Sequence, residues 1–518
     1  MRPSKITIGS RWSKLALWQA NYVKDTLLKL GINSQIKIIK TKGDRIKHLS
    51  FDKIEGKGFF TKEIEAALLD QDIDLAVHSL KDLETDQPKG LSLGAIPVRE
   101  NPSDTLLVHR NAVDPSNYLD IIKKGVVGTS SARRKNQLLL FREDLIIKDL
   151  RGNVPTRINK LKDGLYDAIV LARAGLNRLE IDVSKFHVLH LSPSIFIPAP
   201  AQGALGLQIR NNDEYMIKIL SKINHKKTEG DVAFERGILN GIGGGCHSPM
   251  GAFSKINQNG KRNTWVTFSE NVDKTPIRFF SDSESTEEIL KKIKQKKRSK
   301  KVWISRELNS DSILRKLLEN SSCYITSQSL IEKTKLSLEF LPKCDWIFFN
   351  SSFCYDSIKQ LKSTFKNKKI AAFGDATARY LKAQNLKVSF IGTGSPNNVA
   401  KDFKSTIDRD DVVFFPSSNI SIGTVQKLIL EKNKTVKKSY ETKLLEKIIE
   451  HHDYFIFTSP SNVEAYVKTN SLKGVKAISI GPTTTQTLKD NGATNIYQAS
   501  ESSELALADI VLNLIWIF

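Results

Sequence analysis

One arrangement recurs along this 518-residue sequence: a short apolar stretch ends in Ser, Thr, Lys or Arg, and a segment with helical spacing follows. The first example is KITIG, a helical pattern that stops at Gly31, and then QIKIIKT. Others are DIDLAVHSL, GVVGTSSARRKNQLLL and DAIVLARAGLNRL. Strands that alternate with helices form parallel sheets, and such sheets bind ligands at the carboxyl ends of their strands. The predicted fold class is therefore α/β, with functional side chains at those strand ends.

At roughly 100–200 residues per domain, the length predicts three to five domains. The Pro- and Gly-rich stretch around residues 197–215 indicates a crossing between lobes. A smaller unit follows, in which EGDVAFERGILNGI predicts a helix, GGGCHSP a glycine-rich loop, and TWVTFS and PIRFFS antiparallel strands. After residue 302, WIFFNSSF, VVFFPSSN and FIFTSPSNV each place a strand before helix-capping residues, and AAFGDATARYL and AISIGPTTTQTL form a matching pair. We expect two similar α/β lobes there.

The net charge is +23, and residues 291–301 alone carry eight positive charges and no aromatic residue. Nucleic-acid binders spread a basic footprint over a folded face, often with aromatics for stacking, so we favour a basic linker or solvated helix end over a nucleic-acid or anionic-lipid patch. The smaller excess of positive charge in the rest of the chain suits binding of an anionic small molecule. The N-terminus has no signal-type apolar segment, and the longest apolar run, DIVLNLIWIF, is too short to span a bilayer. We expect a cytoplasmic protein without membrane partners.

The four cysteines show no CxxC spacing and no paired His cluster, which predicts neither a disulfide framework nor a metal site. Cys246 differs from the others because it follows three glycines in GIGGGCHSP, where backbone and thiol can be approached closely. A lone cysteine is usually a small buried hydrophobic residue. From the residues alone, a reactive or covalently modified Cys246 stays open beside that interpretation.

Charged residues at the predicted strand ends are the other candidates. Asp82 ends LAVHSLKD with Lys81 beside it, and a carboxylate there can protonate a leaving amine or stabilise a developing cation. A helix cap or a surface ion pair is the structural alternative, and His78 is expected in the core. Arginines pair bidentately with carboxylates, so several at strand ends indicate a polyanionic ligand. The arginines at such positions are Arg11, Arg133, Arg134, Arg151, Arg157 and Arg178.

Eight motifs in residues 1–251 resemble porphobilinogen deaminase (hydroxymethylbilane synthase). They are SRWSKLALWQA, EGKGFFTKEIEAALL, DLAVHSLKD, GTSSARRKNQL, RGNVPTRINKL, DAIVLARAGLNRL, PAPAQGALGLQIR and GGGCHSP. The resemblance implies two lobes like periplasmic binding proteins, a small α+β domain, and a dipyrromethane cofactor joined to Cys246 by a thioether. On this basis we expect domain 1 at 1–97 and 198–217, domain 2 at 98–197, and domain 3 at 218–290.

The resemblance also implies site roles. Asp82 would assist loss of ammonia from porphobilinogen and stabilise the azafulvene cation, which the growing pyrrole chain attacks. The residues implied to hold the carboxylates of the cofactor are Ser13, Lys81, Ser131, Arg133 and Arg134, and those implied to hold substrate are Arg11, Arg151, Arg157 and Arg178. Ala132, PAPAQG and Glu55 depart from the usual pattern, yet they remove no charged or thiol position.

The second half resembles uroporphyrinogen-III synthase through WISRE, FFNSSF, AFGDATARYL, KSYETK, FTSPSNV and ISIGPTTTQTL. That family has two hinged α/β lobes, expected here at 302–335 with 441–518 and at 336–440, and needs no metal or organic cofactor. The resemblance implies that Tyr440 assists loss of a hydroxyl group, although Tyr440 could equally be a hinge-packing aromatic residue. The implied substrate-binding residues are Ser459, Thr483 and Thr484.

Together the two resemblances imply a bifunctional enzyme of tetrapyrrole (heme) biosynthesis. It would join four porphobilinogens into hydroxymethylbilane and close that product, with inversion of the last ring, to uroporphyrinogen III. We expect a monomer that acts on small molecules, without nucleic-acid partners. The alternatives are an active deaminase with a non-catalytic second half, or a non-catalytic anion-binding module.

Overall fold

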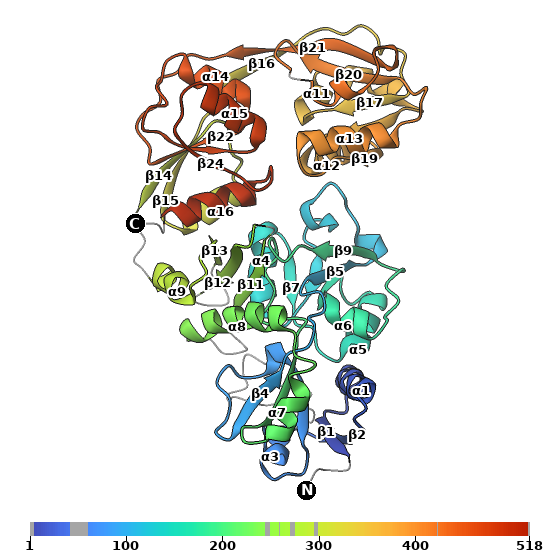
Figure 1. The fold of residues 1–518 in the computed structure, drawn as a ribbon. Helices are drawn as coiled ribbons and strands as arrows, with labels where there is room; N and C mark the ends of the chain where they lie inside the picture. Colours follow the sequence, from blue (N-terminus) through green and yellow to red (C-terminus); the bar gives the residue numbers. More distant parts are fainter. Residues whose placement is uncertain are drawn as a thin grey trace. The chain divides into compact units, whose positions relative to one another are not determined.

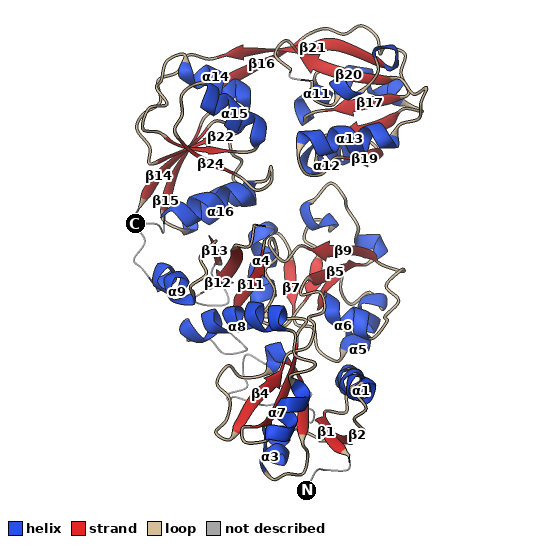
Figure 2. Cartoon of the chain, in the orientation of Figure 1, coloured by secondary structure: helices blue, strands red, loops and turns tan. Residues whose placement is uncertain are grey.

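The computed structural model describes residues 5–41, 61–243, 249–257, 259–269, 275–294, 299–421 and 423–515. Cys246 lies outside the described residues. The chain divides into two compact units, Met1–Val113 with Ile121–Lys296, and Asp114–Asp120 with Lys297–Phe518 (Figure 1). Helices and strands alternate along both units, as the colours of Figure 2 show. The chain is therefore a mixed α/β protein, as predicted.

The first sheet of unit 1 has the order β2-β1-β3-β10-β4, with β1, β2 and β3 parallel and β10 antiparallel to β3 and β4. Its strands are β1 (Ile6–Ser10), β2 (Ser34–Ile38), β3 (Leu75–Ser79), β4 (Leu91–Ala95) and β10 (Leu205–Arg210). Its helices are α1 (Lys14–Lys29), α3 (Lys62–Leu69) and α7 (Glu214–Leu220). The β1-α1-β2 unit confirms the prediction from KITIG and QIKIIKT.

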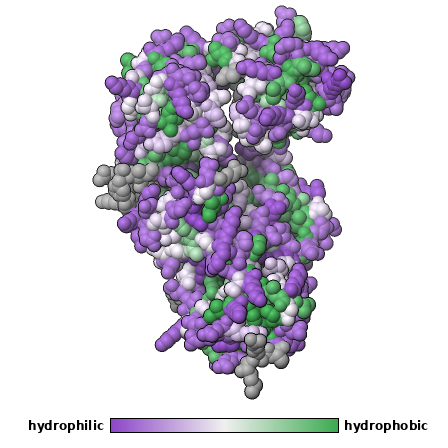
Figure 3. Space-filling view, in the orientation of Figure 1, coloured by the Kyte–Doolittle hydropathy of each residue, from purple (hydrophilic) through white to green (hydrophobic). Residues whose placement is uncertain are grey.

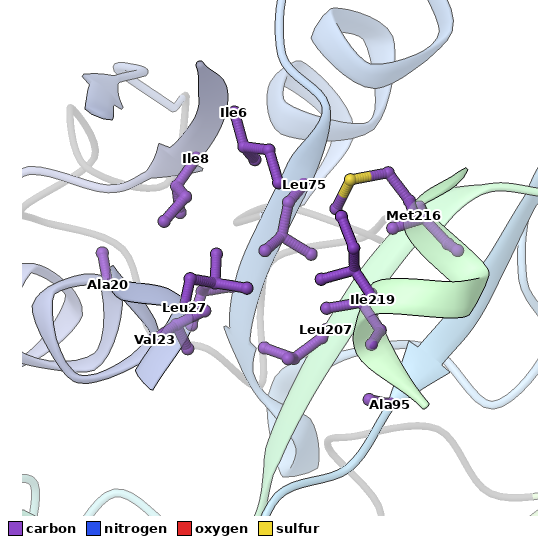
Figure 4. Close-up of a cluster of buried hydrophobic side chains, with 13 residues drawn as sticks. Ile6, Ile8, Ala20, Val23, Leu27, Leu75, Ala95, Leu207, Met216 and Ile219 are labelled. Atoms are coloured by element: carbon purple, nitrogen blue, oxygen red, sulfur yellow. The ribbon is translucent and has the colours of Figure 1, made fainter. Parts of the chain in front are cut away.

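The core of this sheet follows from the spacing of apolar residues on α1. Ala20, Val23 and Leu27 are fully buried and form one stripe along the helix, as positions three and four residues apart do. Figure 4 shows this stripe facing Ile8 of β1 and Leu75 of β3, with side chains of α7 in the same cluster. The apolar periodicity of the sequence thus determines which side of α1 covers the sheet.

The second sheet has the order β7-β6-β8-β5-β9. Its strands are β5 (Asp104–Val108), β6 (Val126–Gly128), β7 (Ile146–Lys148), β8 (Ala168–Ala172) and β9 (His187–Leu191). Its helices are α4 (Ala132–Phe141), α5 (Val154–Lys162) and α6 (Arg173–Arg178). After β9 the chain passes through the Pro- and Gly-rich segment and returns to the first sheet as β10, as expected for a crossing between lobes.

The last part of unit 1 is an antiparallel sheet, β11-β12-β13, with two helices. The elements are α8 (Lys226–Gly241), β11 (Met250–Ile256), β12 (Arg262–Phe268), β13 (Ile277–Ser281) and α9 (Thr286–Lys294). The predicted helix and the two predicted strands are confirmed, and β11 is an additional strand. Helix α9 extends into the basic run, so the expected linker boundary at residue 290 falls inside a helix.

A buried ion pair joins this last part to the preceding sheets. The carboxylate of Glu235 on α8 accepts two hydrogen bonds from Arg99, at 2.8 and 2.9 Å. It also accepts the backbone N–H groups of Ala201 at 2.7 Å and Ser254 at 3.0 Å. Since Glu235 is fully buried, these four donors replace the water that its charge would otherwise need.

Unit 2 contains two more sheets. A parallel sheet has the order β15-β14-β22-β23-β24, and a six-stranded sheet has the order β16-β21-β20-β17-β18-β19, in which only β16 and β21 pair antiparallel. The strands are β14 (Lys300–Ile304), β15 (Cys323–Ser327), β16 (Ile331–Lys335), β17 (Trp346–Phe349), β18 (Lys369–Ala372), β19 (Val388–Ile391), β20 (Val413–Ser418), β21 (Lys434–Leu444), β22 (Tyr454–Phe457), β23 (Lys476–Ser479) and β24 (Asn495–Gln498). The helices are α10 (Ile313–Asn320), α11 (Ser352–Asp356), α12 (Asp375–Ala383), α13 (Pro396–Thr406), α14 (Pro460–Val467), α15 (Pro482–Asp490) and α16 (Glu504–Ile515).

Two details of unit 2 differ from expectation. VVFFPSSN forms β20, but only 3₁₀ turns, Gln426–Leu428 and Glu431–Asn433, are found among the described residues between β20 and β21. Gly423, at a φ of +67°, has a conformation that a right-handed helix does not contain, so the predicted helix there is wrong. Strand β16 and residues 441–444 of β21, both expected in the first lobe, pair with each other at the edge of the six-stranded sheet.

Hydrophilic residues cover most of the face drawn in Figure 3, with smaller hydrophobic areas between them. Among the described residues, no helix has the length and apolar character needed to cross a membrane.

Candidate active sites

Asp82 sits on a turn that several backbone contacts hold in place. Strand β3 ends at Ser79, and the next three residues form the 3₁₀ turn Leu80–Asp82. Leu80 is buried, and its carbonyl and that of Leu83 accept hydrogen bonds from Arg236 at 3.0 and 2.9 Å. The Asp82 side chain is exposed, and no described residue forms an ion pair or hydrogen bond with its carboxylate. A fixed backbone thus presents an unpaired carboxylate.

A chain of polar contacts starts beside this carboxylate. Lys81 donates to Gln202 Oε1 at 3.5 Å, and Gln202 Nε2 donates to Asp104 at 3.0 Å. Burial lowers the pKa of Lys81 to about 8, with the negative charge of Asp82 acting in the opposite direction and the positive charge of Arg134 reinforcing the shift. Lys81 is therefore a partly desolvated cation next to Asp82.

Asp104 is the counter-ion of two arginines at the start of α4. Its carboxylate accepts a hydrogen bond from Arg133 at 2.9 Å and one from Arg134 at 2.7 Å. Burial alone would raise the pKa of Asp104, but the two guanidinium groups hold this pKa well below its usual range. The Nε of Arg134 is buried and has no hydrogen-bond partner among the described residues. One donor of the network is therefore free for a ligand.

Arg157 on α5 adds a further positive charge to this region. Its Nε donates to the carbonyl of Gly152 at 2.8 Å, and Gly152 has a φ of +107°, which a side chain would strain. Burial and the charge of Arg134 lower the pKa of Arg157 to about 10, and the charge of Asp82 acts in the opposite direction. Lys81, Arg133, Arg134 and Arg157 thus outnumber the carboxylates of Asp82 and Asp104 by two charges.

The structure gives two of the other predicted ligand residues local roles. Ser13 is the N-cap of α1 and accepts the backbone N–H of Ala16 at 3.2 Å. Ser131 precedes α4 without capping it through its side chain, and its backbone N–H donates to Thr129. Both hydroxyl groups keep a proton that can be donated to a carboxylate.

Arg11 and Arg151 are two further arginines of the predicted set. Arg11 is near enough to His78 to lower its pKa, although burial is the main cause of the shift to about 4. His78 is buried and contacts Gln208 at 3.1 Å, which confirms the expected core histidine. Arg151 directly precedes Gly152 and is half-buried.

Arg178 occupies a different environment at the end of α6. It donates to the carbonyl of Gly203 at 2.7 Å, and its guanidinium lies 5.6 Å from the ring centre of Trp18. Both side chains line an open pocket of about 430 Å³ together with Lys14 and Asn21 of α1. Arg178 is therefore a buried guanidinium with an aromatic support at the wall of a pocket, and it has no hydrogen bond to Asp104 among the described residues.

Asp104 and Gln202 were missed by the sequence analysis. Asp104 begins an apolar strand and carries no motif that separates it from a surface aspartate. Gln202 lies in PAPAQG, a segment singled out only because its Pro and Ala residues depart from the usual family pattern. Its side chain bridges Lys81 and Asp104. In the described part of the chain, no cluster of three or more His, Cys, Asp or Glu side chains could hold a metal ion.

In unit 2, Tyr440 of β21 points toward α11. Its hydroxyl lies 3.6 Å from the Sγ of Cys354, and its ring packs edge-on against Phe353 with ring centres 5.1 Å apart. Burial and the neighbouring Cys354 raise the pKa of Tyr440 far above its usual value, and hydrogen bonds with Ser418 and Ser351 only partly oppose this. Tyr440 is therefore a protonated phenol that can donate.

The other predicted synthase residues start helices on the parallel sheet. Ser459 caps α14 by accepting the N–H of Asn462 at 3.3 Å. Thr483 is exposed in the first turn of α15, whereas Thr484 is almost fully buried there. No hydrogen bond among the described residues links these side chains to Tyr440, so the structure does not join them into one set of contacts.

These geometries define a two-part α/β protein whose first unit has a cationic site suited to a carboxylate-rich ligand. Residues 6–218 match the family model of porphobilinogen deaminase, dipyromethane cofactor binding domain. Porphobilinogen deaminase from Maridesulfovibrio salexigens is 49% identical over 254 residues, which cover 49% of this chain and 80% of the relative. The enzyme of the same name from Clostridium novyi is 42% identical over 275 residues, covering 52% of this chain and 90% of the relative. The chain belongs to the porphobilinogen deaminase family.

The second half matches a different family. Residues 325–509 match the family model of uroporphyrinogen-III synthase HemD. Among solved structures, a uroporphyrinogen III synthase from Thermus thermophilus is 13% identical, covers 40% of this chain and 95% of that chain, and has a TM-score of 0.29. A likeness this weak adds nothing to the assignment, which rests on the family model. Both families are thus present on one chain.

The cofactor named by the first family model can be tested against the described residues. A dipyrromethane carries acetate and propionate side chains, so it needs several cations and hydrogen-bond donors. The two surplus positive charges near Asp82 and the free Nε of Arg134 fit this requirement. The buried part of the site is therefore compatible with the cofactor, whereas Cys246 lies outside the described residues.

Proposed function

We propose that this chain is a bifunctional enzyme of tetrapyrrole biosynthesis. Its first unit would join porphobilinogen molecules into hydroxymethylbilane with release of ammonia, and its second unit would close that product to uroporphyrinogen III. The observation that carries the proposal is the match to both families, in the order in which one product becomes the next substrate. A cytoplasmic, monomeric enzyme without nucleic-acid or membrane partners is part of the same proposal.

In the first unit, Asp82 would act on the leaving amine. Its carboxylate would bind the ammonium of porphobilinogen and then stabilise the cation left when ammonia departs. Arg157 would hold substrate carboxylates beside it, with Arg11, Arg151 and Arg178 binding the growing chain. When bound through Cys246, the dipyrromethane group supplies the pyrrole to which new units are added.

The cofactor's own carboxylates would be held by Ser13, Lys81, Ser131, Arg133 and Arg134. Arg133 and Arg134 are prepositioned by Asp104, which removes the entropy cost of ordering two long side chains when a ligand arrives.

The domain boundaries expected from the sequence, including two lobes of the periplasmic-binding type, remain our proposal for unit 1.

In the second unit, Tyr440 would donate its proton to the departing hydroxyl group of hydroxymethylbilane. A phenol is protonated at neutral pH, and burial, which raises the pKa of Tyr440, keeps the proton on the hydroxyl until a ligand accepts it. Ser459, Thr483 and Thr484 would bind the substrate at helix starts, where backbone N–H groups favour carboxylates. Thr484 would need local rearrangement for its buried hydroxyl to reach a ligand.

The bifunctional proposal is tested by supplying porphobilinogen to the full chain and analysing the product isomers. Hydroxymethylbilane closes spontaneously to the type I isomer, so type III product requires the second activity. We expect mainly uroporphyrinogen III. Type I product alone would indicate an active deaminase with a non-catalytic second half. Unchanged porphobilinogen would indicate a non-catalytic anion-binding module.

Replacing Tyr440 with phenylalanine should lower synthase turnover by roughly 10-fold to 100-fold and shift the product toward type I, because the proton donor is lost with little change in volume. The measurement is the isomer ratio and rate with hydroxymethylbilane supplied directly. Tyr355→Phe is the matched control, since Tyr355 is buried in the same core cluster as Tyr440 but its hydroxyl has no hydrogen-bond partner among the described residues. An unchanged ratio in Tyr440→Phe would mean that Tyr440 serves only as a packing residue between β21 and α11.

A further inference from the structure

Two lysines of β16 flank Tyr440. Strand β16 pairs antiparallel with β21, and the register places Lys335 opposite Tyr440 and Lys333 opposite Thr442. Directly paired residues project from the same face of a sheet, and residues two apart on one strand also share a face. Lys333 and Lys335 therefore lie on the face that carries Tyr440.

The charges of this strand pair are separated by face. The acidic residues within the paired segments 331–335 and 440–444 are Glu332 and Glu441, and both alternate to the face opposite Tyr440. Lys443, which is paired with Glu332, lies on that opposite face too. The face with Tyr440 thus carries two lysines from β16 and no acid from either segment.

The two lysines also lack partners of opposite charge. No described residue forms an ion pair with Lys333 or Lys335, and both residues are exposed. The ammonium of Lys333 lies 5.3 Å from the ring centre of Phe353, and that ring packs edge-on against Tyr440. Burial of this ammonium against the Phe353 ring lowers the pKa of Lys333, although the residue as a whole is exposed. The positive charge of Lys333, which no described acidic side chain neutralises, is therefore separated from Tyr440 by the ring of Phe353.

We propose that Lys333 and Lys335 bind carboxylate side chains of the linear tetrapyrrole beside Tyr440, so that the β16–β21 strand pair recognises the substrate. The inference rests on the proposed synthase function and assigns substrate recognition to two residues of that site. Lysines on an edge strand also discourage pairing with other chains. That protective role does not depend on which face the lysines occupy, whereas carboxylate binding next to Tyr440 does.

The test compares three variants of the full chain. Lys333→Met with Lys335→Met removes both charges and keeps the aliphatic length, Lys333→Arg with Lys335→Arg restores the charges, and Lys443→Met removes one charge from the opposite face. For supplied hydroxymethylbilane, we expect the double Met variant to raise KM about 5-fold to 10-fold with kcat within about 2-fold. Its KM should also depend less on salt concentration. The double Arg variant and Lys443→Met should stay close to the parent.

A binding measurement makes the result independent of turnover. Uroporphyrin III is a stable macrocycle with the same acetate and propionate groups, and coproporphyrin III lacks the acetate carboxylates. The double Met variant should bind uroporphyrin III more weakly than the parent and lose most of the preference over coproporphyrin III. If the unmodified chain makes no type III product, the proposed synthase function is refuted. The binding comparison would still show whether Lys333 and Lys335 bind carboxylates. Parent-like KM and affinity in the double Met variant, or an equal loss in Lys443→Met, would overturn the inference.

Discussion

Asp82→Asn should lower the rate of porphobilinogen consumption by about 10³-fold while the protein remains folded and keeps its covalent cofactor. The change removes the charge but little volume, and the side chain is exposed with no partner among the described residues, so no structural contact is lost. Lys81 and Arg157 would remain beside the site, but nothing would balance the cation that forms when ammonia leaves. Steady-state kinetics and intact mass measure the two expectations separately.

Asp86→Asn is the matched control for this variant. Asp86 lies four residues further along the same loop, and its only described side-chain contact is a long one, 3.4 Å from Asn240. The same loss of charge should therefore leave turnover within about 2-fold of the parent. Normal turnover in Asp82→Asn, or equal losses in the two variants, would contradict the assigned role of Asp82.

Asp104→Asn should destabilise the first unit by about 3–5 kcal/mol, because it leaves two buried guanidinium groups without their counter-ion. Arg133 and Arg134 are each less than a tenth exposed, so water cannot replace the lost carboxylate without rearrangement. Urea denaturation followed through a probe of unit 1 measures the change. The ammonium of Lys81 would also lose the compensating negative charge of Asp104. Binding of carboxylate ligands at Lys81 should therefore change together with stability.

The effect of Asp104→Asn should depend on pH. The pKa of Asp104 is lowered in the folded state, so its stabilisation is fully present above its unfolded value of about 3.9 and is lost as the pH falls toward the folded value. The difference between parent and variant should therefore be largest near neutral pH and shrink in acid. Asp72→Asn is the control, because Asp72 pairs with Lys37 at 3.3 Å and both side chains are about half exposed. The control should cost less than about 1 kcal/mol, and an equally small cost in Asp104→Asn would contradict the network's role.

The regular part of the fold was predictable because it depends on local pattern. The stripe of Ala20, Val23 and Leu27 identifies both the helix and its buried face, and strands that end in polar residues appear where the sequence places them. The wrong helix after VVFFPSSN has a local cause as well. Its Pro and Ser residues resemble a helix start, but β20 continues through Ser418 and Gly423 adopts a positive φ. Capping residues therefore predict a helix only where the following segment can continue it.

The candidate sites were predictable only in part, because their partners come from distant parts of the chain. The arginines at strand ends indicated a polyanion, but Asp104 stands about thirty residues before Arg133 and Arg134 and looks like any strand-initial aspartate. The face shared by Lys333 and Tyr440 depends on the register between β16 and β21, which are about a hundred residues apart. Spacing in the sequence does not specify such pairings; the packing of the sheets does.

Intact mass of the purified chain, with and without Cys246→Ser and before and after porphobilinogen is added, tests whether the first unit is a working deaminase. We expect a mass excess of one dipyrromethane that depends on Cys246, followed by stepwise additions of single pyrrole units. The Cys246→Ser chain should show neither the excess nor the additions. An unmodified parent mass that porphobilinogen never changes would contradict the account and leave the cationic site as a binding scaffold.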